Sequence, residues 1–372
     1  METYSMGRKK TCILTFHSAY NFGAVMQAYA LQEYITQHFG EARILDYHNT
    51  SLDKSYASPK FTDLFHNPKQ TIFRFIQSRL YRGKNKRIDQ FRREYLKLTK
   101  RYEANDIQDA NDEADVFITG SDQVWNHMII GKDTNFFLDF VDARKRTCSY
   151  AASIGVKQIP DAYSELYKNA LGHVQKISVR ETAGIQTLAD IGVDSADVMP
   201  DPTLLLPAAQ WDTLAVSPNT GGKYILVYKI TTADKLITFA RDLAKKTGLP
   251  IIYIPNDLKS GIVGSLKLNV GPKEWLGYID NAEYVVTNSF HGTVFSILLG
   301  TKFFSEVSGK VNPSTSRLMS LLALFGLEER IIERYTNEML GKELPKDHIA
   351  DICKDQQNRA YKFLKEVYIG EG

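Results

Sequence analysis

A histidine stands where one apolar stretch ends and another is about to begin. Residues 285–293 read VVTNSFHGT, and an apolar segment follows at 294–299. This order is typical of a strand, a sharp loop and the start of a helix. A helix start presents unpaired backbone N–H groups and the positive end of the helix dipole, so it can hold a phosphate or a carboxylate. We therefore expect an anion-binding corner, with His291 at its opening and Gly292 allowing the close approach of a ligand.

The motifs of several common enzyme classes are absent from the sequence. It contains no GxGxxG, no GxxxxGK[ST], no GxSxG and no DxD pair that would hold a metal against a sugar nucleotide. This argues against a dehydrogenase, a kinase and a metal-dependent sugar transferase. The eight histidines are scattered, so a histidine-based metal site would have to be assembled from distant segments. We expect no metal and no cofactor.

Length and composition limit the class of protein. A chain of 372 residues with 43% hydrophobic content can form two domains of ordinary size. No apolar run reaches eighteen residues, and the polar N-terminus lacks the apolar core of a signal peptide, which predicts a cytoplasmic protein. Cys12, Cys148 and Cys353 lie far apart without zinc-ligand spacing, so we expect reduced thiols.

The elements that must position these residues alternate between strand and helix in two series. In the first series we expect strands at 12–16, 43–47, 116–119, 147–150 and 177–179, and helices at 24–37, 161–172 and 182–191. In the second we expect strands at 224–228, 251–254, 284–287 and 303–306, and helices at 233–246, 274–279 and 316–325. Such alternation is typical of parallel sheets covered by helices on both faces.

The predicted fold is therefore α/β, with two Rossmann-like domains facing across a cleft. Prolines and glycines cluster at 201–222 and mark the boundary. We expect an N-terminal, acceptor-side domain at 1–205 and a C-terminal, donor-side domain at 206–372 that ends in a helix. Because ligands of open parallel sheets bind outside the carboxyl ends of the strands, the active site should lie in the cleft.

A basic helical insertion is expected at about 60–105 in the first domain. Residues 69–101 contain 12 Lys or Arg against Asp89 and Glu94, with apolar residues interleaved at roughly helical spacing. One interpretation is that these are helices with solvated basic faces. The other is a surface for anionic lipid headgroups or a lipid-linked diphosphate. Nucleic acid ranks last, because no nucleic-acid-binding motif accompanies the patch.

Six motifs together resemble the polysaccharide pyruvyl transferase family, in an order and spacing that cover residues from about 12 to 330. They lie at 20–32, 119–126, 149–153, 177–181, 201–206 and 287–293. The resemblance implies transfer of the pyruvyl group of phosphoenolpyruvate onto two hydroxyls of a sugar. The product would be a ketal on a capsular, exopolysaccharide or cell-wall glycan precursor. It also implies a fold similar to the GT-B glycosyltransferases, with the donor held by the C-terminal domain.

Phosphoenolpyruvate carries two anionic groups, so its site needs cationic forks and helix-end amides. Arg180 follows the strand at 177–179, and the resemblance implies donor binding there. The alternative is a salt bridge with Glu181 or a strut between the domains. His291 matches the donor-binding corner of the family, unless it is a hydrogen-bonded wall residue. Arg317 would clamp a second anion, unless it is a surface arginine. The residues expected to bind the donor are Arg180, Phe290, His291, Gly292 and Arg317.

Ketal formation needs a general acid and a general base. His291 is the expected acid, because a bound phosphate would stabilise its imidazolium. Asp122 is the expected base or a ligand of the acceptor hydroxyl; the alternative is a helix cap. Asn21 could equally serve turn chemistry, and Trp125 is expected in the core. The residues expected to bind the acceptor are Tyr20, Asn21, Gln27 and Asp122.

Two other functions stay open from the sequence. One is a metal-independent GT-B glycosyltransferase that uses a nucleotide sugar, and the other is a non-catalytic glycan- or lipid-binding relative. The partners expected for the main hypothesis are phosphoenolpyruvate and a glycan acceptor, either lipid-linked or a nucleotide sugar. Contact with an anionic membrane at the inner face of the cell membrane would follow from the basic insertion.

Overall fold

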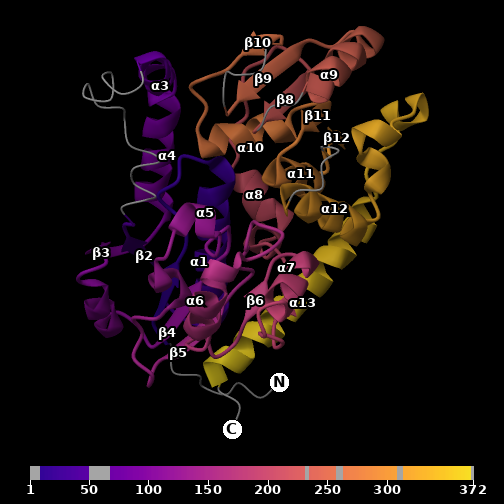
Figure 1. Cartoon of the computed structure of the whole chain (residues 1–372). Coiled ribbons are helices and arrows are strands. Elements are labelled where there is room, and N and C mark those ends of the chain that lie inside the picture. The colour runs from indigo at the N-terminus through magenta and orange to yellow at the C-terminus, as the bar shows by residue number, and fades with distance from the viewer. Residues whose placement is uncertain (1–8, 50–67, 231–233, 257–262, 308–312, 370–372) are drawn as a thin grey trace. The chain divides into compact units, whose positions relative to one another are not determined.

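The computed structural model describes residues 9–49, 68–230, 234–256, 263–307 and 313–369 (Figure 1). The chain divides into two compact units. Unit 1 consists of Met1–Tyr56, Arg92–Leu206 and Cys353–Gly372, and unit 2 consists of Ala57–Phe91 and Pro207–Ile352. The sequence predicted one boundary between residues 205 and 206. The division of the structure follows it at 206/207, but groups residues 57–91 with unit 2 and residues 353–372 with unit 1.

Unit 1 is built on a parallel sheet of five strands in the order β3-β2-β1-β4-β5 (Figure 1). The strands are β1 (Thr11–Leu14), β2 (Ala42–Tyr47), β3 (Leu98–Tyr102), β4 (Val116–Thr119) and β5 (Arg146–Ser149). Strands β1 and β4 are buried at every residue, as expected for a parallel sheet covered on both faces. After β1 the chain forms β2 and β3 on one side of β1, and β4 then pairs with β1 on the other side. The carboxyl ends of β1 and β4 therefore form a topological switch point, where such sheets bind ligands.

The helices of unit 1 connect these strands. They are α1 (Phe22–His38), α5 (His127–Ile130), α6 (Asp161–Leu171) and α7 (Thr182–Ala189), with the short helices η2 (Ile107–Asp112), η3 (Thr134–Phe137) and η4 (Pro202–Leu204). A separate pair of strands, β6 (Ser178–Val179) and β7 (Asp197–Val198), follows α6. Trp125 lies in the core as expected, fully buried and stacked on Phe137 with 5.6 Å between the ring centroids.

Unit 2 repeats the same topology, with five parallel strands in the order β10-β9-β8-β11-β12. The strands are β8 (Ile225–Lys229), β9 (Ile251–Pro255), β10 (Ser265–Leu266), β11 (Tyr284–Thr287) and β12 (Phe303–Ser305). The helices are α8 (Ala208–Leu214), α9 (Asp234–Thr247), α10 (Pro272–Asp280), α11 (Phe290–Leu298) and α12 (Pro313–Phe325), followed by η5 (Glu328–Arg330), η6 (Ile332–Arg334) and η7 (Asn337–Leu340). Its switch point lies between the carboxyl ends of β8 and β11. The two repeats confirm the predicted α/β fold with two Rossmann-like units.

Helices α3 (Pro68–Leu80), α4 (Arg82–Tyr95) and α13 (Lys346–Ile369) complete the part of the chain that the structure describes. The basic region forms the helices α3 and α4, but the insertion expected at about 60–105 also contains strand β3, and its residues 60–67 lie outside the described part of the chain. The expected C-terminal helix is α13. Among the described residues, no helix is both long and apolar enough to cross a membrane. Cys12, Cys148 and Cys353 are buried free thiols, as expected, and burial raises the pKa of Cys353 to about 11.

Candidate functional site

Two buried side chains, Thr15 and Gln27, link the elements at the switch point of unit 1. Thr15, just after β1, donates a hydrogen bond through Oγ1 to the carbonyl of Ser121, just after β4, at 3.0 Å. Gln27 of α1 donates through Nε2 to Thr15 Oγ1 at 2.8 Å and to the carbonyl of Ala24 at 3.0 Å. Gln27 is fully buried. It therefore fixes α1 against the strand ends, and the geometry favours this structural role over the predicted contact with an acceptor.

Tyr20 and Asn21 lie at the same edge, immediately before α1. Asn21 is the N-cap of that helix, because its side chain accepts from the backbone N–H groups of Gly23 and Ala24. This is the turn chemistry that the sequence left as an alternative. Tyr20 is partly exposed, and the guanidinium of Arg92 lies over its ring at 4.9 Å. Of the two, Tyr20 keeps the better access for a sugar.

Asp122 occupies an unusual turn at the end of β4. Its φ is 73°, in the left-handed region, and Ala151 at the end of β5 has a φ of 47°. Such backbone conformations cluster at functional sites. Asp122 does not cap α5, because the cap is Asn126, whose side chain accepts from the N–H of Met128. The carboxylate of Asp122 instead accepts from the N–H of Gln123 at 2.9 Å and stays 18% exposed.

Arg180 lies among three carboxylates. Its guanidinium pairs with Asp201 at 2.8 Å, with Asp122 at 3.8 Å and with Glu181 at 3.9 Å, and its side chain is only 2% exposed. Burial opposes the charge of Arg180, but the three acids outweigh that effect and raise its pKa. The ion pair with Glu181 was the alternative at the sequence level, although Asp201 is the closer partner.

This cluster has a formal excess of negative charge, three carboxylates against one guanidinium. Backbone bonds hold its members in register, since Ser153 N–H donates to the carbonyl of Asp122 and Arg180 N–H donates to the carbonyl of Ala152. Three carboxylates would repel an anionic donor. A sugar hydroxyl, in contrast, can donate a hydrogen bond or a proton to one of them. Donor binding by Arg180 stays a prediction, and the geometry favours a role in holding Asp122.

The anion corner of unit 2 has the predicted order of elements: β11 ends at Thr287 and α11 begins at Phe290. Ser289 is the N-cap, and its Oγ accepts from the N–H of Gly292 at 3.1 Å. A Cβ on Gly292 would meet Thr287 Oγ1 at 2.7 Å, so glycine is needed here for close packing. His291 is half-buried at the first turn, with the ring of Phe290 edge-on at 5.2 Å.

Arg317 and Lys229 are two buried cationic residues of unit 2. Arg317 of α12 is only 7% exposed, so the alternative of a surface arginine is wrong. Lys229 ends β8 and is fully buried. It precedes Ile230, whose N–H donates to Asn288 Oδ1 in the corner at 2.9 Å. Lys229 was not among the residues predicted from the sequence, although a lysine that ends an apolar strand before a loop is a signal that points to such a position.

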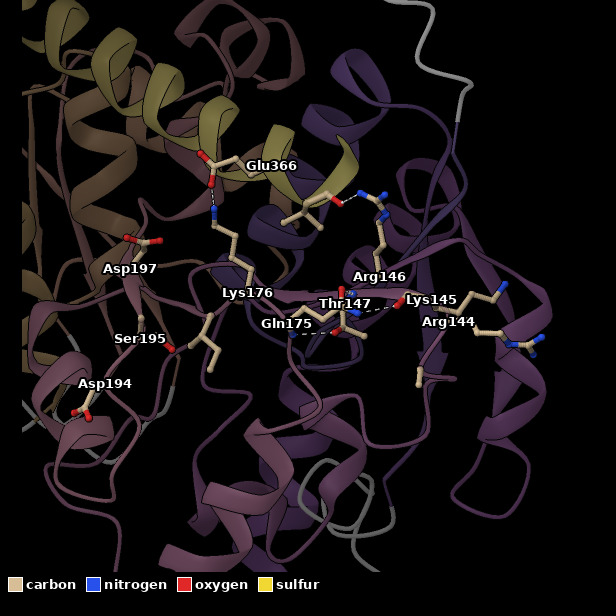
Figure 2. Close-up of a pocket in the computed structure, with 14 residues that line it drawn as sticks. Arg144, Lys145, Arg146, Thr147, Gln175, Lys176, Asp194, Ser195, Asp197 and Glu366 are labelled. Carbon is tan, nitrogen blue, oxygen red and sulfur yellow. Dashed lines mark hydrogen bonds and ion pairs between the residues drawn. The ribbon is translucent and has the colours of Figure 1, made fainter. Parts of the chain in front are cut away.

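A pocket of about 790 Å³ lies elsewhere in unit 1 and contains none of the predicted residues. Figure 2 shows it among the segments that precede β5, β6 and β7, at the amino ends of these strands. There Arg146 donates to the carbonyls of Val367 and Ile369, and Lys176 pairs with Glu366, so the pocket borders the end of α13. Because parallel sheets bind ligands at carboxyl ends, we do not place the catalytic site here.

Solved structures share the fold at low sequence identity. A putative UDP-N-acetylglucosamine 2-epimerase from Listeria monocytogenes has 10% identity and a TM-score of 0.50, with 98% of each chain covered. The UDP-GlcNAc 2-epimerase from Neisseria meningitidis bound to UDP-GlcNAc has 11% identity and a TM-score of 0.47, with 97% of this chain and 100% of that chain covered. The similarity to the Listeria structure shows the GT-B-like fold of two Rossmann-like units.

None of the curated proteins compared with this chain matches it significantly. The family described as polysaccharide pyruvyl transferase matches residues 21–305. That range begins after β1 and includes the end of β4 with the Asp122 turn, Arg180, and the switch point of unit 2 with the His291 corner. Since the match covers more than half of the chain, the chain belongs to the polysaccharide pyruvyl transferase family and is a pyruvyl transferase enzyme.

Proposed function

We propose that this enzyme transfers the pyruvyl group of phosphoenolpyruvate onto two hydroxyls of one sugar in a glycan precursor, forming a ketal. The observation that carries the proposal is the corner between β11 and α11, where a helix start and a half-buried histidine meet within the family match. A helix start favours an anion, and a neighbouring imidazole can transfer a proton to it or to its carbon frame.

The proposal assigns the donor to unit 2. The N–H groups at the start of α11 would face one anionic group of phosphoenolpyruvate, and the guanidinium of Arg317 would contact the other anionic group. His291 is the general acid, protonating the methylene carbon of the enol. The neighbouring carbon then becomes an electrophile of oxocarbenium character. The phosphate's own charge would keep the imidazolium of His291 stable until that step.

The proposal assigns the acceptor to unit 1. The first sugar hydroxyl loses its proton to a general base as its oxygen attacks the electrophilic carbon. The second attacks as phosphate leaves, which closes the ketal. Asp122 is the proposed base, because it is the partly exposed carboxylate of its cluster. Arg180 acts as a positioning residue, since its ion pairs hold Asp122 and Asp201 in place. Tyr20, with its partly exposed ring, is the proposed contact with the sugar.

Thermal unfolding with different donors tests the assignment. A ligand present at 100 times its dissociation constant stabilises a protein by about 2.7 kcal/mol. We expect phosphoenolpyruvate to raise the unfolding temperature in the absence of any UDP-sugar. His291→Gln should lose the shift, whereas His173→Gln, which alters an exposed histidine, should retain it. A shift produced by UDP-sugars alone would favour a glycosyltransferase and contradict the proposal.

A further inference from the structure

Three potential metal ligands meet at one edge of the unit 1 sheet. His17 follows β1, Asp46 lies near the end of β2, and His48 is the residue directly after β2. Because β1 and β2 are parallel neighbours, their carboxyl ends lie at the same edge. The sequence predicted no metal because its histidines are scattered. The fold brings two of them together although 30 residues separate them along the chain.

Both imidazoles converge on the same carboxylate oxygen. Nε2 of His17 lies 2.8 Å from Asp46 Oδ1, and Nε2 of His48 lies 3.0 Å from it. The potential ligand atoms all lie within 4.8 Å of one another. The side chain of His17 is 3% exposed, and those of Asp46 and His48 are each 19% exposed. The cluster is thus held on its buried side and open to solvent on the other.

The second nitrogen of His17 indicates what its Nε2 can do. Nδ1 of His17 lies 3.2 Å from the carbonyl oxygen of Thr15, which can only accept, so Nδ1 carries a proton. In a neutral imidazole Nε2 then carries a lone pair, and this nitrogen lies 2.8 Å from the carboxylate oxygen Oδ1 of Asp46. Either a second proton or a cation must lie between them. A histidine that donates one N–H to a backbone carbonyl while the other nitrogen binds metal is the usual arrangement at metal sites.

The donor set and its dimensions fit a borderline divalent ion. Two imidazoles and one carboxylate, with an open fourth position, form the ligand set of many catalytic zinc sites. Tetrahedral bonds of about 2.0–2.2 Å place neighbouring ligand atoms about 3.3–3.5 Å apart. The present separations of 2.8 and 3.0 Å would have to widen by about half an ångström. The half-buried side chains of Asp46 and His48 allow a movement of that size.

We propose that the chain binds one divalent cation of the Zn²⁺ type through His17 Nε2, Asp46 and His48 Nε2, with water or a substrate oxygen in the fourth position. The backbone of Asp46 is fixed by its N–H bond to Thr99 Oγ1, and that of His17 by its N–H bond to the Thr15 carbonyl. Thr15 also bonds Ser121 beside Asp122. A cation here adds positive charge at the edge that carries the Asp122 cluster.

The test measures metal binding by the full chain and does not depend on turnover. Protein freed of metal by a chelator is titrated with Zn²⁺ in competition with a chromophoric chelator, and separately with Co²⁺ by visible absorption. We expect one equivalent of Zn²⁺ and the absorption of tetrahedral Co²⁺. His48→Gln and Asp46→Asn should each weaken binding at least about tenfold, because even outer partners of metal ligands cost 10- to 100-fold in affinity.

His173→Gln is the matched control, because His173 pairs with Asp139 at 3.1 Å in the same unit and has an exposed side chain. It should bind Zn²⁺ as the wild type does. His48 is preferred to buried His17 for substitution, and circular dichroism of each variant confirms folding. If folded wild type takes up no stoichiometric Zn²⁺, or His48→Gln and Asp46→Asn both bind like wild type, the proposal is overturned and a proton bridges the cluster instead.

Discussion

Gly292 sets the packing of the anion corner at the scale of single residues. A methyl group there would meet Thr287 Oγ1 at 2.7 Å, Ser289 Cβ at 3.1 Å and Tyr228 Cδ1 at 3.1 Å. We expect Gly292→Ala to destabilise the protein by about 1–3 kcal/mol, as overpacked cores do, and to weaken binding of phosphoenolpyruvate. Gly341→Ala is the control, because nothing lies within 4 Å of its added carbon. Equal denaturant midpoints for the two variants would contradict this packing argument.

Arg180 illustrates how far a single residue could be interpreted from sequence. Its position after a strand and its ion pair with the adjacent Glu181 were predictable, but Asp122 and Asp201 come close to it only in the fold. Removing one partner of a buried ion pair costs about 3–5 kcal/mol, because the remaining charge is left uncompensated.

We therefore expect Arg180→Met to lower the free energy of unfolding by about that amount. Arg144→Met should change the free energy of unfolding far less, because Arg144 pairs with Asp142 at an exposed site where water screens the charges. Urea denaturation of both variants makes the comparison. A folded Arg180→Met protein with a loss as small as that of Arg144→Met would show that the carboxylates do not need this cation.

Lys84 predicts a pH-dependent stability. It is 5% exposed, its Nζ donates to Asn256 Oδ1 at 3.0 Å, and burial lowers its pKa to about 8. Because the folded pKa is below the usual 10.5, the charged form is penalised on folding. The penalty is full below pH 8, fades between pH 8 and 10.5, and is absent above.

One pKa unit corresponds to about 1.4 kcal/mol, and a lost hydrogen bond to Asn256 costs about 1 kcal/mol. Lys84→Met should thus stabilise the protein by about 2–3 kcal/mol at pH 7, and the gain should disappear as the pH rises toward 10.5. Lys86→Met, on the exposed face of the same helix, should change stability by less than about 0.5 kcal/mol. A gain for Lys84→Met that does not depend on pH would refute the assignment.

At the scale of elements, α3 presents a solvent-facing apolar row. Ile72, Ile76 and Leu80 are spaced four residues apart and are 52%, 54% and 37% exposed. Basic Arg79, Arg82 and Lys86 line a pocket beside Leu268 and Asn269. Apolar side chains next to cations suit an interface with anionic lipid headgroups. We propose that α3 and the start of α4 contact an anionic membrane surface.

The charge reversal that tests this contact must avoid two residues of the basic region. Lys84 is buried and Arg87 pairs with Glu274, so replacing either would disturb the fold. The triple variant Arg79→Glu, Arg82→Glu, Lys86→Glu should lose sedimentation with anionic vesicles. Wild-type binding should fall as salt rises, because the screening length drops from about 10 Å at 0.1 M to about 3 Å at 1 M. Equal sedimentation of wild type and variant would leave α3 and α4 as helices with solvated basic faces.

Elements built from contiguous residues could be predicted, and those fixed by distant contacts could not. The strand, loop and helix around His291 were predictable because β11, Ser289 and α11 follow one another in the chain. Strands β3, β7 and β10 were missed, because pairing with neighbouring strands defines them. The His17–Asp46–His48 cluster was missed for the same reason: its members meet only when β1 and β2 pair.

At the scale of the whole molecule, the two repeated sheets explain why one chain can provide two chemically different edges. The edge of unit 1 carries Asp122, Glu181 and Asp201 around one arginine, and the corner of unit 2 is a helix start with His291 in its first turn. The doubly wound topology was predictable from alternation alone. The grouping of residues 57–91 with unit 2 and of residues 353–372 with unit 1 depends on long-range packing, which no local pattern encodes.

Mass spectrometry of the reaction product tests the central claim most directly. The enzyme is incubated with phosphoenolpyruvate and a pool of lipid-linked oligosaccharides and nucleotide sugars, and inorganic phosphate is measured in parallel. We predict that one acceptor gains the mass of a pyruvyl ketal and that one phosphate is released for each ketal formed. Asp122→Asn and His291→Gln should abolish both signals, and His173→Gln should retain them. Transfer of a sugar from a nucleotide sugar, with no phosphate release from phosphoenolpyruvate, would contradict the account.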